Sequence, residues 1–138
     1  KLKPTEVALA RLAKMHEPTY LHQTMGRAKD GSIVRFKDIP LAMAAIDQLR
    51  ALEELRVHFH VPVNADRLSD ELSTTNDHLR AALDVIAKAP GACRELEIET
   101  YTWEVLPPEV RAADVADMIA EEYRWTLAEL AQRGVQPL

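Results

Sequence analysis

The chain has 138 residues, 47% of them hydrophobic and 28% charged, which is typical of a folded protein with its own core rather than of a disordered chain. Its net charge of −5 is spread over interspersed acids and bases, so no basic face is offered to nucleic acid. No apolar run approaches the roughly 18 residues that span a bilayer and no secretory signal is recognisable, so we expect no membrane insertion. The single cysteine, Cys93, excludes an internal disulfide and indicates a cytoplasmic protein.

Helical patterns and strand-like stretches alternate along the chain. The elements predicted in chain order are a helix over about 4–15, a strand over 18–24, a helix over 38–54, a strand over 55–63, a helix over 74–89, a strand over 95–102 and a helix over 111–132. Asp38 is the expected N-cap of the second helix, and Gly134 is expected to end the last one. Two apolar stripes are expected to face a core: Leu79, Ala82, Leu83 and Ile86, and Ile119, Tyr123, Leu127 and Leu130.

The predicted strands begin about 36 and then about 40 residues apart, which suits one strand–helix unit each. Strands joined by such long crossovers are expected to be parallel. The predicted fold class is therefore α/β, with about three parallel strands and four helices. Three strands are too few to close a barrel, so this pattern favours either a piece of a barrel or a small open sheet.

Polar side chains occupy one face of the predicted strands. His58 and His60 alternate with apolar residues in the second strand, and Glu97 and Glu99 do so in the third, while His22 lies in the first. Neighbouring parallel strands lie roughly 4.8 Å apart, so His60 and Glu99 could reach a common atom. Unpaired charges are costly to bury, which leaves three readings: a solvated face, a hydrogen-bonded His–Glu pair, or a bound cation. Imidazole with carboxylate suits Mn, Co, Zn or Fe, and Mg less well.

Two segments resemble the end of the EboE group of "metabolite traffic" proteins: His58-Phe-His-Val-Pro62 and Glu97-Ile-Glu-Thr-Tyr-Thr-Trp-Glu-Val-Leu-Pro107. Tyr20-Leu-His-Gln23, Gly31 and Phe36-Lys-Asp-Ile-Pro40 are also similar to this group. The group belongs to the xylose-isomerase-like TIM barrels, which include sugar phosphate isomerases and epimerases. The resemblance implies that residues 1–138 are a single C-terminal segment of a partial (βα)8 TIM barrel whose N-terminal strands are absent, in keeping with a chain that begins at Lys1 without Met.

The resemblance also implies roles for individual residues. His60 and Glu99 would bind a divalent metal ion (Mn, Co, Zn or Mg), and Glu97 and Glu99 would be the catalytic carboxylates. The expected substrate contacts are His22, His58, Tyr101 and Trp103, although Tyr101 and Trp103 could instead plug the end of the barrel.

The function implied for the complete barrel is metal-assisted proton transfer alpha to the carbonyl of a sugar phosphate. Related enzymes use a Glu and an Asp on earlier strands, so this chain alone is expected to be inactive. The alternatives are a non-catalytic protein that binds or carries a metabolite, and a metal-dependent hydrolase. The expected partner is a small metabolite or sugar, and open sheet edges would favour self-association.

Overall fold

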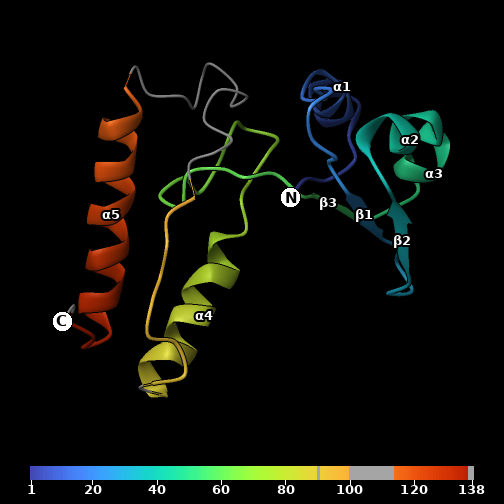
Figure 1. The fold of residues 1–138 in the computed structure, drawn as a ribbon. Helices are drawn as coiled ribbons and strands as arrows, with labels where there is room; N and C mark the ends of the chain where they lie inside the picture. Colours follow the sequence, from blue (N-terminus) through green and yellow to red (C-terminus); the bar gives the residue numbers. More distant parts are fainter. Residues whose placement is uncertain (90, 100–113, 137–138) are drawn as a thin grey trace. The chain divides into compact units, whose positions relative to one another are not determined.

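The computed structural model describes residues 1–89, 91–99 and 114–136. The chain divides into two compact units. The first unit comprises Lys1–Phe59 and Arg67–Ser73, and the second comprises His60–Asp66 and Thr74–Leu138. Every strand of the described residues lies in the first unit, whereas the longest helices lie in the second (Figure 1).

The first unit is built on a small antiparallel sheet. Its strands are β1 (Thr24–Arg27), β2 (Ile33–Phe36) and β3 (Glu54–Val57), in the spatial order β2-β1-β3. Both pairings of β1 are antiparallel. The β1–β2 connection turns at Gly31, whose φ of 83° suits glycine, and the Asp30 carboxylate accepts a hydrogen bond from the Ser32 backbone N–H at 2.9 Å.

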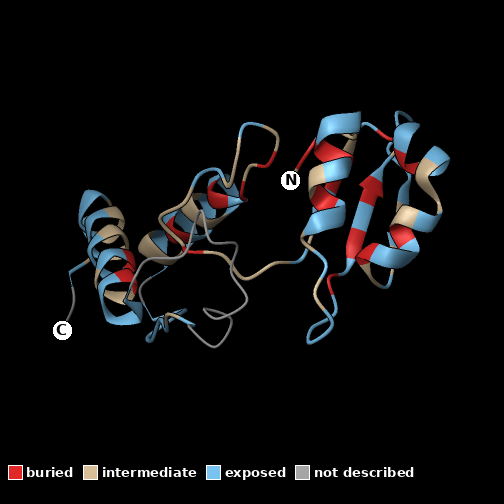
Figure 2. Ribbon diagram, turned by 90° about the horizontal axis from the view of Figure 1, so that it is seen from above, coloured by how far each residue is buried: buried red, intermediate tan, exposed pale blue. Residues whose placement is uncertain are grey.

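Three helices cover one face of this sheet: α1 (Glu6–Lys14), α2 (Ile39–Ala44) and α3 (Ile46–Arg50) (Figure 1). Thr5 caps α1 by accepting a hydrogen bond from the Ala8 backbone N–H, and Asp38 caps α2 through the N–H of Ile39. The core between helices and sheet is apolar (Figure 2). Its most deeply buried side chains include Leu9, Leu12, Ile39, Leu49 and Leu55.

The second unit contains α4 (Asn76–Lys88) and α5 (Val115–Gln132). Asp114 caps α5, and the helix ends before Gly134, whose φ is 75°. Few apolar side chains are fully buried among its described residues, namely Leu83 and Met118. None of the helices in the described ranges is both long enough and apolar enough to cross a membrane.

The predicted partial TIM barrel is wrong, because the described strands form an antiparallel sheet and a TIM barrel requires parallel ones. The reason is local. The Asp30–Gly31 turn folds the chain back into a hairpin, so β1 pairs with β2 and no helix intervenes between them. The strand predicted over 18–24 is wrong except at Thr24, the first residue of β1, and no strand was predicted at β2. The strand predicted over 55–63 shortens to β3, which ends at Val57. Residues 95–99 form no strand, and 100–102 lie outside the described residues.

The helices were predicted more accurately than the strands. The helices predicted over 4–15, 74–89 and 111–132 correspond to α1, α4 and α5, with residues 111–113 outside the described part. The helix predicted over 38–54 is interrupted at Ala45, whose φ of −102° and ψ of 40° separate α2 from α3. The two predicted apolar stripes are only partly covered. Leu83 is buried, whereas Tyr123 and Leu127 are 50% and 42% exposed. The half-buried members are Leu79, Ile86, Ile119 and Leu130.

Candidate functional site

The structure separates the residues that the sequence analysis selected. His22 and His58 belong to the first unit, whereas His60, Glu97 and Glu99 belong to the second. The predicted substrate contacts Tyr101 and Trp103 lie outside the described residues.

His60 and Glu99 are in direct contact. The His60 Nδ1 atom lies 3.0 Å from a carboxylate oxygen of Glu99, and the two side chains are 32% and 60% exposed. Both residues lie in irregular segments, so the contact does not arise from neighbouring parallel strands as predicted. Glu97 is exposed two residues earlier in the same segment. The contact brings an imidazole and a carboxylate together, but their roles in metal binding and catalysis stay predictions.

His22 lies in a buried polar corner of the first unit. It is only 5% exposed, and its ring packs against that of Phe59 with centroids 4.2 Å apart. The backbone N–H of His22 donates to the Asp38 carboxylate at 2.9 Å, and the same oxygen accepts from Ile39 at 2.8 Å. The residue that caps α2 therefore also ties the helix to the segment preceding β1.

A second histidine completes a group that the sequence analysis did not identify. His16 follows the end of α1, and ring nitrogens of His16 and His22 and a carboxylate oxygen of Asp38 all lie within 4.8 Å of one another. On the other side of the His22 ring, Nε2 lies 3.7 Å from Glu17. Asp38 was predicted only as a helix cap, and no short motif links residues so far apart in sequence. The only sequence feature that could have indicated this group was an acidic helix cap, Asp38, after a predicted strand that contains a histidine, His22.

Burial of the ring and hydrogen bonds to the carboxylate favour a neutral His22 imidazole beside an ionised Asp38. Burial lowers the pKa of His22, and this effect outweighs the opposing attraction of Glu17 and Asp38. Burial acts to raise the pKa of Asp38, but hydrogen bonds from the His22 and Ile39 backbones bring it below its usual value. These are the protonation states in which both groups can ligate a metal ion.

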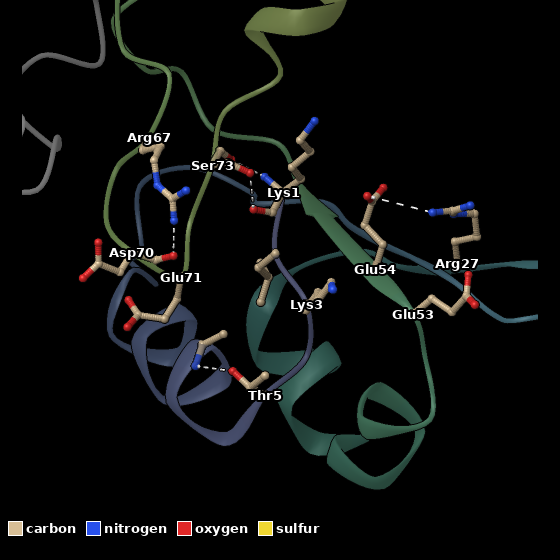
Figure 3. A pocket seen from close by; sticks show the side chains of 12 residues that line it. Lys1, Lys3, Thr5, Arg27, Glu53, Glu54, Arg67, Asp70, Glu71 and Ser73 are labelled. Atoms are coloured by element: carbon tan, nitrogen blue, oxygen red, sulfur yellow. Dashed lines mark hydrogen bonds and ion pairs between the residues drawn. The ribbon is translucent and has the colours of Figure 1, made fainter.

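A separate hollow of about 790 Å³ opens in the first unit between the N-terminal segment, the sheet and residues 67–73 (Figure 3). Its charged lining is mixed in sign. Arg27 lies 3.9 Å from Glu54, and the Arg67 guanidinium donates to the backbone carbonyl of Asp70. None of the predicted site residues within the described ranges, namely His22, His58, His60, Glu97 and Glu99, lines this hollow. Because Arg27 and Arg67 already face acceptor groups of the protein, the hollow does not favour a ligand of either charge.

No family model, curated protein or solved structure matches this chain. The features of the described residues that bear on function are therefore the two histidine–carboxylate groups. Of these, His60–Glu99 is the pair that the sequence analysis selected. Within the described residues, only His16, His22 and Asp38 form a group of three or more candidate metal ligands.

Proposed function

We propose that this chain contributes His60 and Glu99 to a divalent-metal site that serves proton transfer alpha to the carbonyl of a small sugar-like metabolite. The observation that carries the proposal is the 3.0 Å distance between His60 Nδ1 and the Glu99 carboxylate. We also propose a cytoplasmic location, because Cys93 is exposed as a free thiol, a state that reducing compartments maintain.

The spacing of the pair fits a shared cation. An octahedral ion such as Mg²⁺ binds its ligands at about 2.0–2.1 Å, so two adjacent ligands at a right angle lie about 2.9 Å apart. His60 and Glu99 therefore need little movement to bind one ion. Since both side chains are partly exposed, water or substrate oxygens can complete the coordination. Mn, Co, Zn and Mg all accept such mixed ligation, with Mg the least suited to imidazole.

The protein groups divide the chemistry between them. A bound ion would supply Lewis acidity toward the substrate carbonyl. Glu97 is exposed two residues from Glu99, and its carboxylate is the base that we assign to take the proton from the alpha carbon and then return it. His60 and Glu99 would hold this ion close to the Glu97 base. A general base of this kind contributes roughly 10²–10⁴-fold to a rate.

The test is incorporation of solvent deuterium at the alpha carbon of a panel of ketose phosphates, with Mn²⁺ present, in the full-length protein. We expect His60→Ala and Glu99→Gln to lose Mn²⁺ binding and exchange together, and Glu97→Gln to lose exchange while it retains the metal. The matched controls are His78→Ala and Glu121→Gln, which alter exposed side chains on the helices of the second unit.

Two outcomes would contradict the proposal. Unchanged Mn²⁺ stoichiometry in both His60→Ala and Glu99→Gln would remove the metal assignment. Metal binding that depends on the pair, without exchange on any sugar in the panel, would replace the enzyme with the non-catalytic metabolite-binding alternative.

A further inference from the structure

The buried corner formed by His16, His22 and Asp38 lies in the first unit, apart from the residues invoked in the proposed function. Three different parts of the fold supply its side chains. His16 follows the C-terminal end of α1, His22 precedes β1, and Asp38 caps α2. The three side chains therefore come together only in the folded unit. The elements next to them, α1, β1 and α2, pack around the apolar core.

His22 has a ring nitrogen with no protein partner. The residue is 5% exposed, yet its Nδ1 atom makes no hydrogen bond. Buried polar atoms are nearly always hydrogen-bonded or ligated, because leaving one unsatisfied costs about 1–3 kcal/mol. Nδ1 lies 3.9 Å from the Asp38 carboxylate, which is too far for a hydrogen bond. The Asp38 oxygen already accepts two backbone hydrogen bonds, so a species positioned between the two groups would satisfy Nδ1.

The distances suit a metal ion better than a direct contact. Two ligands on one ion with bonds of about 2.1 Å lie about 3.4 Å apart in a tetrahedron and about 4.2 Å apart when opposite each other. The 3.9 Å between His22 and Asp38 is about 0.5 Å longer than the tetrahedral separation, and the ligand atoms of all three residues lie within 4.8 Å of one another, so a modest contraction would bring them onto one ion. His16 is exposed, so its ring can move the remaining distance.

The surroundings also hold the ligands in place. Two backbone N–H groups fix one oxygen of Asp38, those of His22 and Ile39. On the opposite side of the His22 ring, Nε2 faces Glu17 at 3.7 Å, and Glu17 is itself held by the backbone N–H groups of Thr19 and Tyr20. A carboxylate facing the second nitrogen of a metal-bound imidazole is the usual means of orienting such a ring.

We propose that His16, His22 and Asp38 bind a divalent transition metal ion, of which Zn²⁺ is the natural candidate, with water as the fourth ligand. Two imidazoles with one carboxylate form a ligand set that Zn²⁺ and Co²⁺ favour. This site is independent of the His60–Glu99 pair.

The test is a Co²⁺ titration of the chain, followed by the visible absorption bands that tetrahedral Co²⁺ produces, with Zn²⁺ then added as a competitor. We expect the intact chain to produce these bands and Zn²⁺ to abolish them. His16→Ala alters an exposed residue, and Asp38→Asn retains a side-chain oxygen that can cap α2. Each variant should bind Co²⁺ at least about tenfold more weakly, since losing groups that only support ligands already costs about 10–100-fold.

The matched control is His78→Ala, which removes an exposed histidine of α4 and should leave all Co²⁺ bands unchanged. The bands that depend on His16 and Asp38 should persist in His60→Ala, which removes the metal ligand of the proposed function and so separates the two sites. Absence of the bands in the intact chain would overturn the inference. So would wild-type affinity in both His16→Ala and Asp38→Asn, provided that circular dichroism shows both variants to be folded.

Discussion

The two units of this chain bury different kinds of side chain. In the first unit, leucines and isoleucine from three helices pack on one face of the sheet (Figure 2). In the second, Leu83 and Met118 are buried together with polar groups, including Asn76 and Glu122. The first unit therefore relies on removing apolar surface from water, and the second has to satisfy the polar groups that it buries.

Charged hydrogen bonds link the helices of the second unit. Arg133 donates to Asp84 at 2.6 Å and to Glu129 at 2.8 Å, and Arg80 donates to Glu129 at 3.1 Å. The Arg80 guanidinium also lies 5.3 Å from the centre of the Trp125 ring. Arg80 thus joins α4 to α5 through Glu129. Arg133, the C-cap of α5, joins α5 to α4 through Asp84, while Glu129 accepts hydrogen bonds from both arginines. The comparison suggests that core truncations should damage the first unit most, and charge removal the second.

The largest effect is expected from Leu55→Ala in the first unit. Leu55 is fully buried on β3, so truncation should leave a cavity and lower the free energy of unfolding by about 2–5 kcal/mol. Hydrogen exchange of the first-unit amides measures this change. The control is Leu41→Ala, since Leu41 is 55% exposed on α2. Equal losses from the two substitutions would argue against an apolar core centred on the sheet.

A smaller loss is expected from Glu129→Gln in the second unit. The substitution leaves two guanidinium groups without their shared carboxylate, which should cost about 1–3 kcal/mol. Exchange should accelerate in α4 and α5 and remain unchanged in the first unit. Glu121→Gln, at an exposed position of α5, is the control. Equal changes from Glu129→Gln and Glu121→Gln would show that the hydrogen bonds between Glu129 and the two arginines do not stabilise the second unit.

Glu122→Gln should produce the smallest effect, and in the opposite direction. Burial raises the pKa of Glu122, and the hydrogen bond from the Val63 backbone offsets this only in part. The folded chain therefore holds this proton more tightly than the unfolded chain, so stability is lost as pH rises through and above the ordinary value of 4.5. At pH 7 the variant should be about 1 kcal/mol more stable than the wild type.

Urea unfolding at a series of pH values measures the effect of Glu122→Gln. The gain should shrink as pH falls and vanish where Glu122 is protonated in both the folded and the unfolded chain. A gain that did not depend on pH would show that ionisation of this carboxyl is not its cause.

Helices were easier to predict than strands because their signals are local. Asp38 caps α2 as expected, and Gly134 follows α5 with a positive φ. The strands instead depend on pairing between distant segments. Burial alternates along β1, but its sequence, Thr-Met-Gly-Arg, places its apolar methionine on the exposed face, so only the Asp30–Gly31 turn could have indicated the hairpin.

Gly26 itself illustrates why the sheet could not be deduced from side-chain pattern alone. A Cβ at this position would collide with the Leu52 side chain and lie 3.0 Å from that of Leu55. The glycine thus allows two leucines to pack closely on β1, a requirement that only the folded core reveals. Sheet formation here depends on packing more than on the propensity of β1.

The candidate sites show the same division between local and tertiary information. Alternation in the sequence selected His60 and Glu99, which do lie in contact, although the parallel strands assumed for them are not present in the described residues. His16 and Asp38 were not identified as ligands, because only the packing of α1, β1 and α2 brings them beside His22. A histidine at the end of one helix and an acidic cap on another are individually unremarkable.

Paramagnetic mapping with substoichiometric Mn²⁺ tests the central claim most directly, namely that imidazole and carboxylate groups form a cation site at His60 and Glu99. In the ¹H–¹⁵N spectrum of the intact chain, amide signals near these two residues should broaden, and in His60→Ala that broadening should disappear. Loss of signal around His16, His22 and Asp38 would report the second site and should persist in the same variant. Unbroadened signals at His60 and Glu99 at saturating Mn²⁺ would contradict the account.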